Sequence, residues 1–435
     1  MGHLYLAIGI FVLTCIGLVT EKIHKTLIAL FSAMFIVLCH VITAEQAFQS
    51  VDLTVIFLLI SMMLIVNVLG ETGCFQWVAI QMFHISKGEP LVIMLLLSGV
   101  SAVTSAFLPN LTTVLLIAPV TIVLVQYLEL DPVPFLLSEV LSSNIGGTAT
   151  LIGDPPNLII GSGAHLSFNQ FVIHLTPVVI MVQICFMATM YFVFRKSFRV
   201  STEVRARVHE LDSAGVIKDK KLLVKTLIVL GIMIVAFFFQ SFLHLDVAVI
   251  ALTGATILLL ISKYDVDKAF QFVEWPTIFF FVGLFIVVHG LVETGAIHIV
   301  GDYIFKVTRG NVFSATFVIL WFSAFTSAIV DNIPFVVTMI PLVKNMGPRM
   351  AEHMHIALPL VMAPLWWALA LGACLGGNGT VIGSSVNLVV AGMAQKSGYK
   401  ITFLRFMKYG FPLMIESLII CSAYLYIRYL LPIHH

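Results

Sequence analysis

The residues best suited to chemistry in this sequence lie in four short segments that interrupt long apolar runs. The segments are 105–113, 144–157, 327–334 and 376–387, and they are rich in Asn, Thr, Ser, Gly and Pro. A helix interrupted inside a bilayer exposes backbone groups that lipid cannot satisfy, so such breaks survive only where they line a polar cavity. We therefore expect a substrate site built from the following residues: Asn110, Thr112, Thr113, Asn144, Gly146, Gly147, Thr148, Thr150, Asn157, Asn332, Gly376, Gly377, Asn378, Thr380, Ser384 and Asn387.

Three acids within the apolar runs are candidates for binding a coupling ion. Asp154 and Asp331 lie in the interrupting segments, and Glu139 lies in an apolar run. Ionisable residues inside a membrane are costly, so they are functional candidates for binding H⁺ or Na⁺. The alternatives are structural, because Asp154 could cap a helix that begins at Pro155 and Glu139 could bond to a neighbouring helix.

The composition requires a membrane protein. Of 435 residues, 60% are hydrophobic and 10% are charged, and the mean hydropathy is +1.07. Because a soluble protein has about 25% charged residues, a soluble enzyme, a secreted disulfide scaffold and a disordered chain are excluded. The net charge of +1 indicates no nucleic-acid partner. The six cysteines lack metal-ligand spacing and the glycine runs lack the Lys of a phosphate loop, so we expect neither an enzyme nor a cofactor or metal.

The chain contains two copies of one unit. A shift of 222 residues aligns Gly9 with Gly231, and after an eight-residue insertion 146–153 aligns with 376–383. Each copy therefore supplies one hairpin tip and one helix break. The copies carry their acids at different places, since the alignment pairs Asp331 with Pro109 and Asp154 with Ser384.

We predict an all-α polytopic membrane protein with an inverted structural repeat, two re-entrant hairpins, two broken helices and about ten full spans. The first repeat covers 1–194, with a hairpin at about 91–128 and a broken helix at about 135–165; the second covers 226–435, with a hairpin at about 312–343 and a broken helix at about 356–395. A basic linker, 195–225, joins them. If the linker is cytoplasmic and both termini lie outside, 18 Lys and Arg residues are inside and five outside, as expected in a cell inner membrane.

The helix-break motifs resemble those of a known transporter group. The segments 144–157 and 372–383, together with Asp331-Asn-Ile-Pro-Phe335, look like signatures of the ion-transporter superfamily. They are most similar to the branch that holds arsenical pump membrane permeases and the melanosomal P protein. The resemblance implies an elevator-type transporter that forms a homodimer and, in arsenical systems, can pair with a separate ATPase subunit. Pro109 departs from that branch, which often has Asp before the Asn of the first hairpin.

Three substrates remain open. The resemblance implies proton-coupled efflux of arsenite or antimonite, whose neutral hydroxides suit a pocket of Asn, Thr and backbone dipoles. The second reading is Na⁺/H⁺ antiport through Asp154 and Asp331. The third is Na⁺-coupled transport of an organic anion such as a carboxylate, for which the sequence offers no cation within the runs and only the N-termini of half-helices. A passive channel is a fourth, different class.

Overall fold

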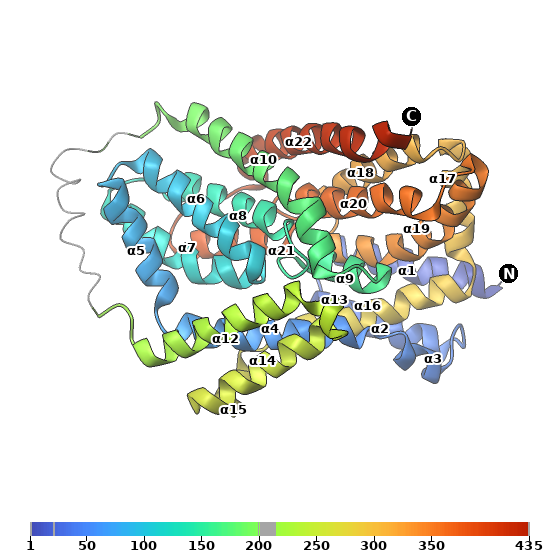
Figure 1. Ribbon diagram of the computed structural model, residues 1–435, viewed down its shortest axis with the longest axis horizontal. Coiled ribbons are helices and arrows are strands. Elements are labelled where there is room, and N and C mark those ends of the chain that lie inside the picture. Colours follow the sequence, from blue (N-terminus) through green and yellow to red (C-terminus); the bar gives the residue numbers. More distant parts are fainter. Residues whose placement is uncertain (1, 21, 199, 201–214, 434–435) are drawn as a thin grey trace.

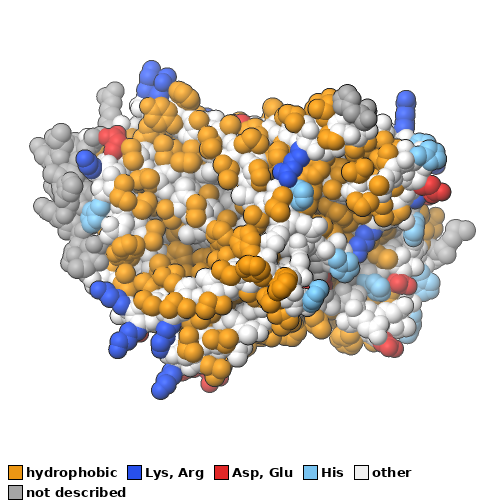
Figure 2. All heavy atoms as spheres, in the orientation of Figure 1, with side chains coloured by type: hydrophobic (Ala, Val, Ile, Leu, Met, Phe, Trp, Pro, Cys, Tyr) orange, Lys and Arg blue, Asp and Glu red, His pale blue; other side chains and the backbone are white. Residues whose placement is uncertain are grey.

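The computed structural model describes residues 2–20, 22–198, 200 and 215–433, and these residues form helices and no strand. Nine of the described helices are long and apolar enough to cross a membrane, by length and composition. Figure 2 shows hydrophobic side chains over the broad middle of one face, with most Lys and Arg toward the left rim. The prediction of an all-helical, polytopic membrane transporter is confirmed.

The first copy contributes ten helices: α1 (Gly2–Thr20), α2 (Lys25–Leu38), α3 (Ala44–Gln49), α4 (Leu53–Glu71), α5 (Cys74–Ser86), α6 (Pro90–Phe107), α7 (Asn110–Tyr127), α8 (Val133–Gly147), α9 (Pro155–Ala164) and α10 (Phe168–Phe194).

The second copy repeats this order: α12 (Lys220–Phe238), α13 (Gln240–Leu243), α14 (Val247–Ser262), α15 (Val266–Gln271), α16 (Trp275–Glu293), α17 (Ala296–Thr308), α18 (Val312–Ile329), α19 (Asn332–Met354), α20 (Leu358–Gly376), α21 (Ser385–Lys396) and α22 (Phe403–Leu425), followed by a π-helical turn (Tyr426–Leu430) and a 3-10 turn (Leu431–Ile433). Local signals repeat as well. Gly73 before α5 and Gly295 before α17 have φ of 81° and 77°, a left-handed conformation that glycine adopts without strain.

Two hairpins enter the centre of the molecule. In the first, α6 and α7 are joined at Leu108 and Pro109, whose extended backbone ends one helix before the next begins. In the second, α18 and α19 are joined at Val330 and Asp331. The arm α19 continues to Met354, beyond the expected limit of about residue 343, because the insertion of the second copy falls in this region.

Two helices are broken next to these tips. In the first copy α8 ends at Gly147 and α9 begins at Pro155; in the second, α20 ends at Gly376 and α21 begins at Ser385. The hairpin arm α6 packs along α8, and α18 packs along α20. Small residues permit this approach, since a Cβ on Gly146 would lie 2.0 Å from the Ala102 carbonyl oxygen and one on Gly376 2.5 Å from that of Ala324.

Helices α2, α4, α14 and α16 form a second group, in which α2 packs on α16 and α4 on α14. In Figure 1 these helices lie below the hairpins, and the two chain ends lie away from the left edge, where α10 ends and α12 begins. The expected linker 195–225 is partly helical, because α12 already begins at Lys220; residues 201–214 lie outside the described part.

Candidate transport site

The tip of the first hairpin is fixed to the first helix break through Asn110. The Asn110 side-chain amide donates to Asn144 Oδ1 at 3.3 Å and to Asp154 Oδ1 at 3.1 Å. Its backbone N–H donates to the Gly153 carbonyl at 3.2 Å. One asparagine therefore joins the hairpin, the end of α8 and the start of α9.

A chain of buried asparagines connects the two copies. Asn144 Nδ2 donates to Asn378 Oδ1 at 2.8 Å and to Asn387 Oδ1 at 3.1 Å. Asn378 in turn donates to the Leu141 carbonyl on α8 at 3.2 Å. These side chains are about 1% exposed, so the two helix breaks meet through amide groups in a dry interior.

Asn157 and Asn387 each donate hydrogen bonds to the backbone of the break loop in their own copy. Asn157 Nδ2 donates to the carbonyls of Thr148 at 3.0 Å and Thr150 at 2.9 Å. Asn387 Nδ2 donates to those of Gly377 at 2.8 Å and Thr380 at 2.9 Å. Each asparagine therefore satisfies carbonyls that the interrupted helix leaves without partners.

The hydroxyls of the break loops bond mainly to the backbone. Thr148 Oγ1 donates to the Asn144 carbonyl at 2.8 Å, Thr150 to that of Ala106, and Thr380 to that of Ala328 at 2.5 Å. Buried Thr113 has no partner for its hydroxyl within the described part of the chain. A Cβ on Gly147 or Gly377, the other two glycines predicted for the site, would lie 2.9 Å or 3.1 Å from a carbonyl oxygen of the break loop.

Some of the predicted site residues line a small cavity of about 60 Å³, where both hairpin tips and both helix breaks converge. Its walls include Asn110 and Thr112 of the first tip, Asn332 of the second, and Asp154 and Ser384 at the starts of α9 and α21. The structure thus brings together residues from both copies, as the sequence predicts. The other four asparagines are absent from this wall. Asn144 bonds to Asn378 and Asn387, whereas Asn157 bonds to carbonyls of its own break loop.

The three predicted acids have different surroundings. Asp154 is 3% exposed and lines the cavity; its Oδ1 accepts from Asn110, and its Oδ2 has no hydrogen bond of good geometry among the described residues, although the Cys374 thiol lies next to the carboxylate. Asp331 caps α19 by accepting from the Ile333 N–H at 3.3 Å. Glu139 accepts from Thr121 Oγ1 on α7 at 2.5 Å and is absent from the cavity wall, so it stands apart from the other two.

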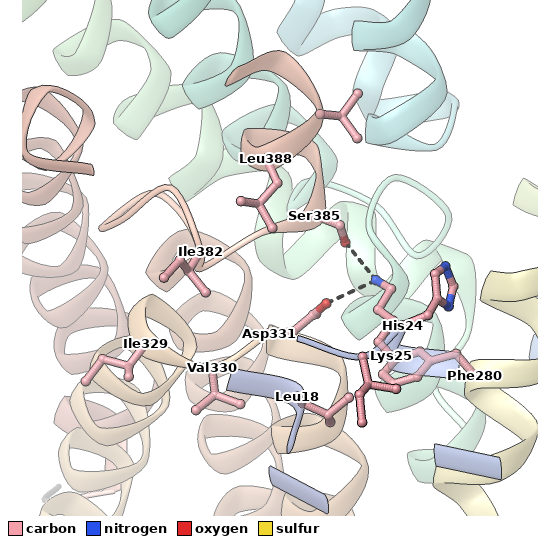
Figure 3. A pocket seen from close by; sticks show the side chains of 12 residues that line it. Leu18, His24, Lys25, Phe280, Ile329, Val330, Asp331, Ile382, Ser385 and Leu388 are labelled. Atoms are coloured by element: carbon pink, nitrogen blue, oxygen red, sulfur yellow. Dashed lines mark hydrogen bonds and ion pairs between the residues drawn. The ribbon is translucent and has the colours of Figure 1, made fainter. Parts of the chain in front are cut away.

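Sequence reasoning missed Lys25, which it treated only as a marker of topology. Figure 3 shows the Lys25 ammonium between Asp331 and Ser385, with Nζ 3.4 Å from Asp331 Oδ2 and 3.5 Å from Ser385 Oγ. Lys25 lines both the small cavity and a wider one of about 300 Å³, whose other walls are largely apolar. Its repeat partner is Val247, and a charge where the other copy is apolar was the available signal. Glu274, another wall residue of the small cavity, was also missed.

The two second half-helices present different ends to this site. The first two helical residues of α9 are Pro155 and Pro156, which have no N–H to donate. Those of α21 are Ser385 and Val386, whose N–H groups have no acceptor in the described part of the chain. The α9 end, with Asp154 and no N–H groups, therefore suits a cation better than the α21 end, which has N–H groups unpaired within the described residues and lies beside the Lys25–Asp331 ion pair.

A sequence profile described as "citrate transporter" matches residues 15–372, more than half of the chain. The chain belongs to the citrate transporter family. An uncharacterised transporter of Mycobacterium tuberculosis is 42% identical over 432 residues, covering 98% of this chain and 99% of the relative. The mouse P protein is 34% identical over 495 residues, covering 95% of this chain and 59% of the P protein. The prediction of an ion-transporter superfamily member related to the P protein is confirmed.

Among solved structures, the YdaH transporter of Alcanivorax borkumensis has a similar fold, with a TM-score of 0.58 over 86% of each chain. At 12% identity this likeness concerns the fold alone. Family membership and fold together identify a multi-pass membrane transporter.

Proposed function

We propose that this member of the citrate transporter family carries a small carboxylate anion across the cell membrane by cation-coupled secondary transport. The observation that carries the proposal is the Lys25 ammonium in the wall of the 300 Å³ cavity, beside the N-terminus of α21. The sequence offered no cation for the organic-anion reading, and Lys25 supplies one. A cavity of this volume, with largely apolar walls and the Lys25–Asp331 ion pair at one side, has the character of a small-molecule site.

Asp154 is the proposed site of the coupling cation, H⁺ or Na⁺. Its second carboxylate oxygen is buried without a partner, and the prolines that follow remove the N–H groups that would otherwise repel a cation there. The Asn110 side-chain amide donates to Asp154 Oδ1 and so holds the carboxylate in place at the cavity wall. Hard cations prefer such oxygen ligands.

Proton-coupled efflux of arsenite or antimonite is the second candidate. The buried chain Asn110–Asn144–Asn378 supports it, because neutral hydroxides need hydrogen-bonding groups and no counter-charge. The asparagines are satisfied by one another, however, whereas Lys25 has weak partners at the cavity wall. We therefore rank the carboxylate first.

Transport by the purified protein in proteoliposomes tests both candidates. We expect labelled citrate or a dicarboxylate to accumulate when an inward Na⁺ or H⁺ gradient is imposed, and Lys25→Gln to lower the initial rate by about tenfold or more. Lys22→Gln, in the same turn of chain, is the matched control and should keep the wild-type rate.

The same vesicles, loaded with arsenite under a pH gradient, decide between the candidates. Arsenite movement without any carboxylate uptake would overturn the first and favour the second. Carboxylate uptake that no cation gradient drives would instead indicate a passive channel.

A further inference from the structure

The Lys25–Asp331 ion pair is the loosest of the Lys and Arg pairs in the described part of the chain. Its N···O distance is 3.4 Å, whereas the surface pairs Lys268–Glu71, Arg349–Asp302 and Arg405–Asp131 lie at 2.5–2.6 Å. Charge-assisted hydrogen bonds normally lie at about 2.7–2.9 Å. The pair is therefore formed but not tight.

The Lys25 ammonium also has donor capacity to spare. An ammonium carries three N–H donors, and the two oxygens that it reaches, on Asp331 and Ser385, lie at 3.4 Å and 3.5 Å. The Phe280 ring lies 5.1 Å away on another side. The side chain is 32% exposed at the wall of the wider cavity, so a ligand can reach it.

The two members of the pair come from different groups of helices. Lys25 begins α2, which packs on α1 and α16, whereas Asp331 and Ser385 belong to the second hairpin tip and to α21. The pair therefore bridges two packing units rather than stabilising one helix.

Comparison of the two copies shows that the two charges of this pair occur together or not at all. The alignment of the two copies replaces Lys25 by Val247 and Asp331 by Pro109, so both charges are lost together on the other face. Removing only one partner would leave the other, a partly buried charge, without its counter-charge. A ligand can therefore take the place of an ion-pair partner only at Lys25 and Asp331, and not at the equivalent positions Val247 and Pro109.

We propose that Lys25 exchanges partners between Asp331 and the carboxylate of the transported anion, so that Asp331 becomes open to a coupling cation only when the anion is bound. This inference rests on the proposed function and deepens it, because it makes Asp331 a second, anion-gated cation site beside Asp154. Before the anion arrives, the tethered ammonium neutralises Asp331. After it arrives, the ammonium pairs with the anion and a free H⁺ or Na⁺ takes its place at Asp331. By linkage, the cation then strengthens anion binding by the same factor as the anion strengthens cation binding.

The charged and titratable neighbours set the limits of this exchange. His24 precedes Lys25 in the wider cavity, and Glu274 lines the small one with its Oε2 accepting from Thr277 at 3.1 Å. Asp154 lies across the same small cavity. Of these groups only Asp331 is within ion-pair distance of Lys25 in the described structure, so it is the acid that Lys25 masks.

Thermal unfolding of the purified full-length protein tests the masking without any substrate. In Lys25→Gln, Asp331 is unpaired, and we expect added Na⁺ or a lowered pH to raise Tm by about 3 °C more than in the wild type. The double variant K25Q/D331N should lose this extra shift, and Lys22→Gln should behave as the wild type. Equal cation shifts in Lys25→Gln, the double variant and the wild type would overturn the masking.

Anion uptake tests the exchange itself. In the wild type, the half-saturating anion concentration should fall about fivefold or more as the cation concentration rises. In Asp331→Asn, where Lys25 is always free, it should already be low without the cation and change little when cation is added. An Asp331→Asn protein that keeps the wild-type cation dependence would overturn the exchange. If the wild type moves no carboxylate at all, the proposed function fails, whereas the unfolding measurement still decides whether Lys25 masks Asp331.

Discussion

At the scale of single residues, the asparagines of the predicted site have two structural roles. Asn110 and Asn144 connect the hairpin tip and the helix breaks through side-chain hydrogen bonds. Asn157 and Asn387 instead donate to backbone carbonyls of the break loops. Sequence reasoning grouped all four as substrate-binding residues. The spacing of an amide along the chain does not say whether it faces a cavity or its own backbone.

We expect Asn387→Ala to destabilise the protein by about 1–3 kcal/mol, because the buried carbonyls of Gly377 and Thr380 would lose their donor. The measurement is the Tm of the purified protein in detergent. Gln395→Ala, an exposed position on the same helix, is the control and should leave Tm unchanged. A stable Asn387→Ala protein with impaired uptake would instead return Asn387 to the substrate site.

We expect Asp154→Asn to abolish cation-driven accumulation, lowering it by about tenfold or more, because the neutral amide removes the charge that holds the cation. Exchange of internal for external labelled anion should persist, since it needs no net cation movement. Asp265→Asn, at the N-cap of the exposed helix α15, is the control. Accumulation at the wild-type level in Asp154→Asn would remove this carboxylate from the coupling step.

At the scale of helices, the transport site depends on how closely each hairpin arm approaches its broken helix. We expect Gly146→Ala to destabilise the protein by about 1–3 kcal/mol or to prevent folding, because the added Cβ meets the backbone of Ala102, which cannot move aside. Gly99→Ala, on the facing arm α6 with open space around it, should be tolerated. Fluorescence-detected gel filtration gives the yield of folded protein; equal yields for the two variants would contradict the close packing.

The helices themselves were predictable where the sequence breaks them. Pro109, Pro155 and the glycines of the breaks interrupt apolar runs locally, so the order of residues alone locates the hairpins and the broken helices. The Lys25–Asp331 contact could not be predicted in this way, because it joins residues 306 positions apart, one from each copy. Periodicity and composition describe short stretches of sequence, so they do not indicate which charged residues from distant parts of the chain come into contact.

At the scale of the whole molecule, the predicted inverted arrangement of the two copies gives a topology that can be measured. In a cysteine-free background, we expect a single cysteine at Lys196 to be labelled by an impermeant maleimide only after the cells are opened. One at Lys306, in α17, should be labelled in intact cells. A cysteine at buried Ala373 is the control and should resist labelling in both conditions. Labelling of both lysine positions from the same side would contradict the inverted arrangement.

The single Lys25–Asp331 pair also makes the two copies unequal. Lys25 belongs to the first copy and Asp331 to the second, so the pair crosses the boundary between them. Two identical half-length proteins, assembled face to face, would have held this pair twice or not at all. The present chain holds it once, with Val247 and Pro109 in the mirror position. A chain built from two first copies or from two second copies would therefore lack the pair, so neither half can stand in for the other.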